Sequence, residues 1–93
     1  MINRQIEVPQ EVDLASFFGN FDENVKMLDK ALSVNIASRD NALRVTGEEE
    51  NVEKASQVIN MLMQIIARGE IIDQQKVLYA ITMVQENGGI DIK

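Results

Sequence analysis

The chain has 93 residues with 15 acidic and 9 basic side chains, and its net charge of −6 repels phosphate backbones and anionic membrane surfaces on average. Hydrophobic residues make up 45% and charged residues 26% of the sequence, so disordered and fibrous classes fit poorly, and the length accommodates a single domain. The absence of cysteine and histidine excludes disulfides, a thiol nucleophile, the usual zinc ligand sets and histidine acid–base chemistry.

The first predicted elements are a strand over residues 4–8 and a short helix over residues 14–18. Polar and apolar side chains alternate along the strand, and Pro9 ends its ladder because proline lacks an N–H donor. Asp13 is expected to cap the helix, and Gly19 lies where a helix C-terminus favours a residue that accepts positive φ.

A second helix is predicted directly after a tight link over residues 19–22. Its apolar residues recur at the spacing of one helical face, at Phe21, Val25, Leu28 and Leu32. Asp22 is the expected N-cap, and Glu23 places a carboxylate in the first turn, where it complements the helix dipole.

A hairpin follows, with arms at residues 34–36 and 43–45. Each arm alternates polar and apolar side chains, and the segment 39–41 between them is rich in turn-forming residues. Gly47 ends the second arm.

Two helices complete the chain. The first follows the triplet Glu48–Glu50 and ends at Arg68 and Gly69, and its predicted buried stripe is Val52, Ala55, Ile59, Leu62 and Ile66. The triplet could be read as a metal site, but consecutive residues do not converge on one ion, and complementing of the helix dipole is favoured. Asp73 is expected to cap the last helix, which buries Val77, Ala80, Ile81 and Val84 and is closed by residues 87–89.

The order of these elements, β-α-α-β-β-α with one extra C-terminal helix, resembles the type I KH fold, an α+β class with a three-stranded antiparallel sheet. In KH domains a Gly-x-x-Gly link between two short helices lets a nucleic-acid backbone approach closely, and the next helix presents its N-terminal amides to phosphate. Here the link reads Gly19-Asn20-Phe21-Asp22, so an aspartate replaces the second glycine.

The string from Phe18 to Val25 goes further and is similar to the N-terminal region of PhoH-like proteins, the phosphate-starvation-type ATPases. These carry a Phe/Cys-Gly-x-x-Asp-x-Asn segment, a helix and a Gly-Val-x-Ile strand; Ser33 stands here where that glycine is common. The similarity continues through Val45-Thr46-Gly47 and both later helices, and so covers nearly the whole chain.

The resemblance implies that a P-loop ATPase domain follows. This chain has no G-x-x-x-x-G-K-[ST] motif, so we expect no catalytic residues and no metal ligands in it, and ATP and magnesium only in the other domain. Residues 1–93 are then a single KH-like domain cut from a longer protein, with a boundary near Gly88 and Gly89 and a frayed last few residues.

The candidate contacts for nucleic acid or a partner are Gly19, Asn20, Phe21, Asp22, Lys26, Arg39 and Arg44. For the link, the alternative is a tight turn in which Asp22 caps the second helix, and this alternative is favoured because capping needs no partner. For the basic residues, the favoured alternative is ordinary solvated surface.

Three functions remain open from the sequence. The first is an accessory domain that positions RNA or a protein partner for a PhoH-like ATPase in RNA metabolism. The second is a pure protein interaction or oligomerisation module, and the third is an autonomous RNA binder. The start of the chain shows no apolar signal region, and no stretch approaches the roughly 18 apolar residues that span a bilayer, so a cytoplasmic location without membrane contact is expected.

Overall fold

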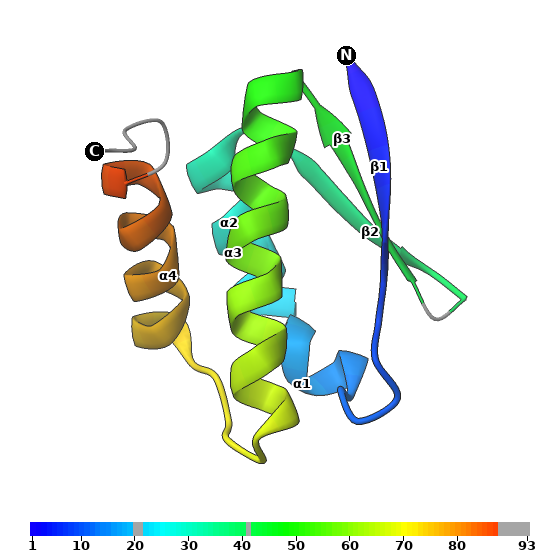
Figure 1. The fold of residues 1–93 in the computed structure, drawn as a ribbon, viewed down its shortest axis with the longest axis vertical. Helices are drawn as coiled ribbons and strands as arrows, with labels where there is room; N and C mark the ends of the chain where they lie inside the picture. The colour runs from blue at the N-terminus through cyan, green and yellow to red at the C-terminus, as the bar shows by residue number, and fades with distance from the viewer. Residues whose placement is uncertain (20–21, 41, 88–93) are drawn as a thin grey trace.

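A computed structural model of the chain describes residues 1–19, 22–40 and 42–87. Its elements in chain order are β1 (Ile2–Glu7), α1 (Leu14–Phe18), α2 (Glu23–Leu32), β2 (Asn35–Arg39), β3 (Ala42–Gly47), α3 (Glu49–Ala67) and α4 (Gln74–Asn87), as labelled in Figure 1. The predicted α+β class with a three-stranded antiparallel sheet is confirmed, and the arrangement is compatible with a KH-like fold.

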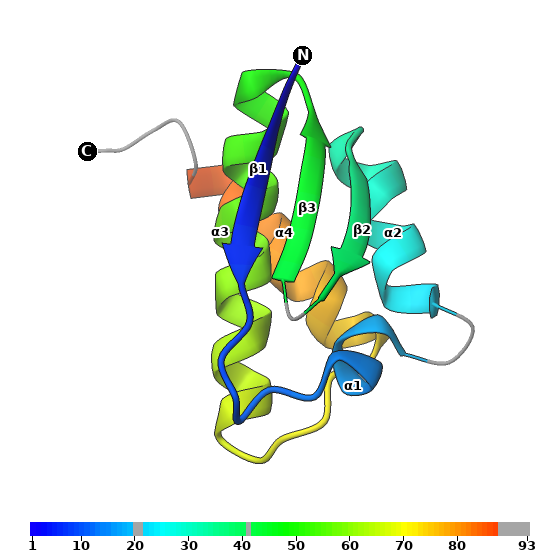
Figure 2. The ribbon, with the colours of Figure 1, turned by 90° about the vertical axis from the view of Figure 1, so that its right-hand side faces the viewer.

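The sheet has the strand order β1-β3-β2, and both pairings are antiparallel. β2 and β3 form the predicted hairpin, in which Arg39 pairs with Ala42 across a two-residue turn. Asp40 in this turn has φ 56°, the left-handed backbone that two-residue hairpin turns require. The later strand β3 thereby takes the centre of the sheet, with β1 added at its other side (Figure 2).

The predicted strand bounds need correction. β1 covers residues 2–7 instead of 4–8, because its ladder with β3 runs from Ile2 opposite Gly47 to Glu7 opposite Ala42. β3 begins at Ala42, which pairs with Glu7. Val8 therefore has no residue of β3 opposite it, and β1 ends at Glu7. Both hairpin arms are also longer than the short alternating segments indicated, since β2 pairs with β3 along its whole length and β3 pairs with β1 on its other side as well.

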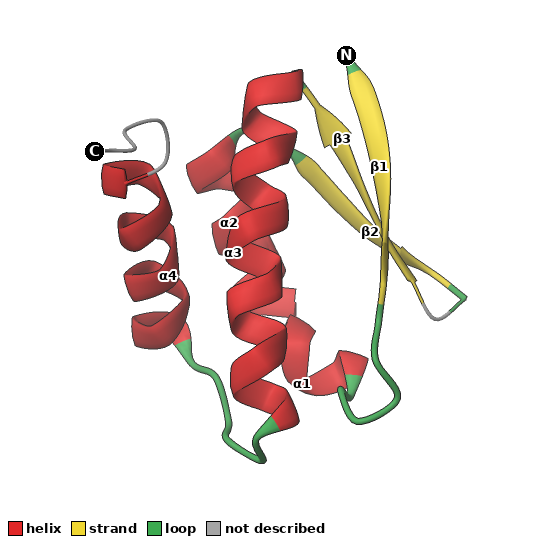
Figure 3. Ribbon diagram, viewed as in Figure 1, coloured by secondary structure: helices red, strands yellow, loops and turns green. Residues whose placement is uncertain are grey.

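α2, α3 and α4 lie on one face of the sheet and α1 lies below the end of its strands, so no helix of the described residues covers the other face (Figures 1 and 3). α3 packs against β1 and β3, while α2 packs against β2, and α4 contacts both α2 and α3. The fully buried side chains between these layers include Phe17, Leu28, Leu43, Val45, Val52, Ile59, Leu62 and Val77. The predicted stripes of α3 and α4 are therefore confirmed as core.

Two predicted helix caps are confirmed. The carboxylate of Asp13 accepts a hydrogen bond from the Ala15 N–H at 3.3 Å, and that of Asp73 accepts one from the Lys76 N–H at 3.0 Å. α4 ends at Asn87, whereas Gly88, Gly89 and the tail predicted to fray lie outside the described residues. None of the helices in the described part of the chain combines the length and apolar character needed to cross a bilayer.

Candidate functional site

The link between α1 and α2 is built around Gly19, which ends α1. Its N–H donates to the Ala15 carbonyl at 3.0 Å, and its backbone has φ 80° and ψ −178°. A Cβ atom on this residue would lie 2.7 Å from the Nδ2 atom of Asn24. Both the backbone angles and the close approach therefore require glycine here.

Asn24 is the functional candidate that sequence reasoning missed. Its side chain is only 1% exposed, and its Nδ2 donates to the Phe17 carbonyl at 3.2 Å. This bond fixes the amide orientation, since a carbonyl only accepts, and leaves Oδ1 buried with no hydrogen-bond partner. The available signal was a polar residue beside Val25 on the inward-facing part of α2. Asn24 thus joins the C-terminal end of α1 to the first turn of α2.

Asp22 precedes α2, as predicted, but it does not cap the helix. Its backbone is left-handed, with φ 59° and ψ 27°, and its carboxylate makes no capping hydrogen bond. An N-cap residue normally has extended backbone, from which its side chain reaches the N–H groups of the first turn. The capping assignment is therefore wrong, and the position retains the left-handed conformation that a second glycine would adopt without strain.

A shallow hollow of about 280 Å³ lies between α1, the link and β2. Its lining residues are Leu14, Ala15, Phe18, Gly19, Asp22 and Ser38. It lies between the same elements as the groove implied by the KH resemblance. Its floor is mainly apolar, and Asp22 supplies the one charged side chain among these lining residues.

A second and larger hollow, of about 640 Å³, lies on the other side of Gly19, between α1, the start of α2 and the loop before α4. Its lining includes Ser16, Gly19, Glu23, Asn24, Ile72 and Asp73. The two hollows share Gly19 and Ala15, so they flank the link.

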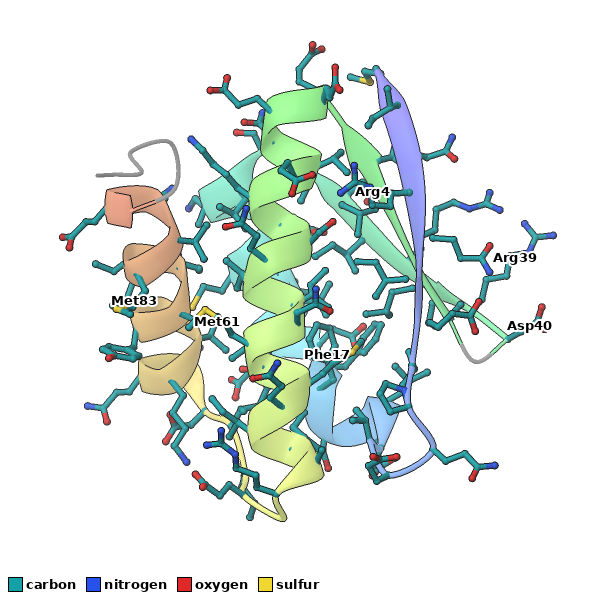
Figure 4. The ribbon with its side chains drawn as sticks, in the orientation of Figure 1. Arg4, Phe17, Arg39, Asp40, Met61 and Met83 are labelled. Carbon is teal, nitrogen blue, oxygen red and sulfur yellow. The ribbon has the colours of Figure 1, made fainter. Side chains whose placement is uncertain are left out.

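The basic candidates do not join these hollows. Arg39 and Arg44 alternate with the inward-facing Ser38 and Leu43, so both lie on the open face of the sheet. Figure 4 shows the Arg39 side chain directed away from the helices. Lys26 is exposed on α2 and lines neither hollow. Asn20 and Phe21 lie outside the described residues.

One partly buried carboxylate, that of Asp29, holds α2 against β2. The Oδ1 atom of Asp29 accepts a hydrogen bond from the Ile36 N–H at 3.0 Å and so attaches α2 to the start of β2. Burial raises the pKa of Asp29 above its ordinary value of 3.8, while the bond from Ile36 acts in the opposite direction.

Arg4 forms a second attachment, on the inner face of β1. Its guanidinium donates to Glu53 Oε1 at 2.8 Å and to Ser56 Oγ at 3.3 Å, both on α3 (Figure 4). The bond from Arg4 lowers the pKa of Glu53. The Asp29 attachment positions α2 beside β2, and the Arg4 attachment positions β1 against α3.

The described residues offer binding surfaces and no assembled chemistry. Within residues 1–19, 22–40 and 42–87, no three His, Cys, Asp or Glu side chains gather in a way that could hold a metal ion. The polar groups at the link are an amide, carboxylates and a serine hydroxyl that donates to Asp13. This arrangement can bind a partner by shape, hydrogen bonds and charge.

The chain is similar to several curated proteins over nearly its whole length. It is 33% identical over 86 residues to a PhoH-like protein of Bacillus subtilis strain 168, an alignment that covers 92% of this chain and 26% of that protein. PhoH-like proteins of Mycobacterium bovis and Mycobacterium leprae are 30% and 28% identical over 87 residues, covering 94% of this chain and 24% and 25% of those proteins.

No protein-family model matches the chain, and no solved structure matches it significantly. The chain spans about a quarter of the length of the curated relatives that it matches. The alignments confirm the resemblance to PhoH-like proteins that the residues around Gly19 indicated. Over nearly its whole length the chain is similar to one part of each of these PhoH-like proteins, as a small domain of a larger protein would be.

Proposed function

We propose that this chain is the N-terminal KH-like accessory domain of a PhoH-like P-loop ATPase and contributes no catalytic residue. The observation that carries the proposal is the alignment over 92% of this chain but only 26% of a PhoH-like relative, which leaves room for a separate catalytic domain. The KH-compatible fold and the lack of a P-loop sequence in residues 1–93 support it. ATP and magnesium would bind in the other domain.

The accessory role is to position RNA or a protein partner for the ATPase. The hollow beside Gly19 supports this role, because it lies between α1, the link and β2, where a KH-type ligand is expected. The proposed contact residues remain Gly19, Asn20, Phe21, Asp22, Lys26, Arg39 and Arg44. A ligand in this hollow would touch Gly19 and Asp22, whereas the two arginines would require a ligand that also reaches the open face of the sheet.

The ATPase assignment is tested on the parent gene and its product. We expect a Walker-type P-loop in the coding sequence beyond Lys93 and ATP hydrolysis by the complete protein. Deleting residues 1–93 should leave basal hydrolysis measurable and change its stimulation by a partner. A gene without a P-loop would contradict the proposal.

RNA binding is tested by titrating the labelled chain with single-stranded RNA at low salt. The proposal predicts amide shift changes at Gly19, Asp22 and Val25, which weaken as salt rises because phosphate contacts are electrostatic. An Asp22→Gly variant should bind more tightly, because it removes a negative charge from the start of α2. The absence of shifts at millimolar RNA would exclude RNA as the positioned ligand.

The second candidate function is a protein interaction or oligomerisation module without nucleic-acid binding. The net charge of −6 and the carboxylates Asp22 and Glu23 at the start of α2 favour it, since both oppose phosphate binding. Light scattering over a range of concentrations tests self-association. A strictly monomeric chain would restrict this candidate to heterologous partners.

A further inference from the structure

We propose that the outward side of α4 is the surface on which the ATPase domain of the same polypeptide docks, through an apolar region of that domain. This inference rests on the proposed function, in which the ATPase domain follows residues 1–93. The residues concerned recur at three- and four-residue spacing and so share one side of the helix. They form the outer patch, which consists of Gln75, Leu78, Tyr79, Thr82 and Met83.

α4 is apolar on two sides. Its inward side packs against α2 and α3, and the buried residues there are Val77, Ala80, Ile81 and Val84. In the outer patch, Leu78 and Tyr79 are 55% and 63% exposed. A surface helix normally has polar and charged residues opposite its buried stripe, whereas a helix that is apolar all round is covered all round. The second apolar side of α4 therefore indicates a contact with another folded unit.

The exposed side of α4 also carries little charge. Its 14 residues include only Lys76 and Glu86 as charged side chains, whereas the 10 residues of α2 include four. Lys76 is directed back to the start of the helix, where its Nζ donates to the Ile71 carbonyl at 2.7 Å. The centre of a protein interface is likewise depleted of charge and enriched in tyrosine and methionine. The outer patch thus fits a protein surface that is itself apolar and has few charges.

The area of the outer patch fits a domain of the same chain better than a separate partner. A helix of 14 residues is about 21 Å long and about 10 Å wide, so one side of it offers on the order of 200–300 Å². Stable interfaces between separate proteins bury about 800 Å² on each partner. Contacts between domains of one chain begin at about 600 Å² in total, or about 300 Å² on each domain. A short linker also holds the next domain at a millimolar effective concentration, so a small interface suffices.

The position of α4 suits a domain that follows it in the chain. Figures 1 and 2 show α4 as the outermost helix, with α3 between it and the sheet. α4 ends at Asn87, and residues 88–93 separate it from the expected start of the ATPase domain. Six residues span at most about 20 Å, so that domain starts within reach of the outer patch.

Thiol labelling tests the docking directly, because the natural chain has no cysteine. Thr82→Cys places a thiol in the outer patch, and Gln57→Cys places one on the exposed side of α3 as the matched control. Each variant is made in the 93-residue chain and in the complete parent protein, and its reaction with iodoacetamide is followed at that site by mass spectrometry. We expect Thr82→Cys to react about tenfold more slowly in the complete protein, since a docked surface is labelled only when it opens. Gln57→Cys should react at the same rate in both.

A double variant tests whether apolar contacts cause this protection. Leu78→Gln and Tyr79→Gln together should restore the reaction rate of Thr82→Cys in the complete protein to its rate in the 93-residue chain. Both side chains are exposed in this chain, so its melting temperature should change little. Ala31→Gln, on the exposed side of α2, is the control and should leave the protection intact.

Three results would overturn the proposal: equal labelling of Thr82→Cys in the two proteins, protection that survives the double variant, or protection in the 93-residue chain that grows with its concentration. The last result would assign the outer patch to a second copy of this chain. The P-loop is read separately from the gene. A parent protein with a P-loop and an unprotected Thr82→Cys would therefore refute the docking and leave the ATPase assignment intact.

Discussion

A Cβ atom added to Gly19 would lie 2.7 Å from the Nδ2 of Asn24 and 3.0 Å from its Cγ. Asn24 cannot move aside cheaply, because it is buried and its amide holds the carbonyl of Phe17. These two residues of the PhoH-like segment are therefore a packed pair. Gly19 ends α1 and Asn24 lies in the first turn of α2. Their spacing in the sequence therefore reflects the contact between these two helix ends.

Gly19→Ala should consequently destabilise the domain by about 2–3 kcal/mol, since the backbone is one that only glycine adopts easily and the new methyl group meets a buried side chain. Gly69→Ala is the matched control, because Gly69 also has positive φ, at 90°, but no atom lies within 4 Å of the added methyl group. This control should lose only about 1 kcal/mol. Urea unfolding measures both, and equal losses would show that the Asn24 contact has no energetic role.

Asp22→Gly should stabilise the domain by about 0.5–1 kcal/mol, because glycine adopts the left-handed backbone of this position without a Cβ penalty. Asp22→Ala should instead be destabilising, since alanine tolerates this backbone less well than aspartate. A capping role would give the opposite sign for glycine, a loss of a few tenths of a kcal/mol. Chemical denaturation of the two variants therefore decides between the two accounts of Asp22.

Three aspartates show what the sequence predicts about helix starts and what it does not: Asp13, Asp22 and Asp73. Each is an aspartate directly before a helical pattern, and two of them do cap their helices. The third, Asp22, differs in its left-handed backbone, which lies beside the tertiary contact between Gly19 and Asn24. No local pattern encodes that tertiary constraint, so the sequence predicted the position of the α2 start correctly and its capping chemistry wrongly.

The elements with regular periods were easier to predict than the site. Apolar residues recur at helical spacing along α3 and alternate with polar residues along the hairpin strands. Packing between α3 and the sheet reinforces both patterns. The alternation around Arg44 even indicated its outward direction, because Leu43 and Val45 flank it and are buried. The two hollows depend on which elements meet across Gly19, and that is a property of the assembled fold.

Ser33→Gly should stabilise the domain by about 1 kcal/mol. Ser33 ends α2 with φ 55°, a left-handed backbone that glycine adopts without strain. Its N–H donates to the Asp29 carbonyl, a backbone bond that the glycine variant keeps, so the change removes only the cost of a Cβ in the left-handed conformation. Ser33→Ala is the control, because it removes the hydroxyl and retains the Cβ. A gain in thermal stability from alanine as large as that from glycine would contradict the backbone explanation.

Asp29→Asn should make the domain more stable at neutral pH, with little effect in acid. Burial raises the pKa of Asp29 above 3.8, so between 3.8 and the raised value the folded state binds more protons than the unfolded state. Stability contributed by the protonated form is therefore lost as pH rises through this window. Asparagine cannot ionise, and its carbonyl oxygen can still accept the bond from the Ile36 N–H.

The advantage of the asparagine variant should grow as pH rises through this window and then become constant. The stability of the Asp29→Asn variant should gain further because Asp29 lies in the last turn of α2, where a negative charge interacts unfavourably with the helix dipole. Asp29→Ala separates ionisation from hydrogen bonding, because it removes both and leaves the buried Ile36 N–H without its acceptor, at a cost of about 1–3 kcal/mol. Unfolding free energies measured for the three proteins below pH 3.8 and at neutral pH test this linkage. If the difference between Asp29→Asn and the natural chain did not change with pH, the carboxylate would titrate alike in the folded and unfolded states, and its burial would carry no electrostatic cost.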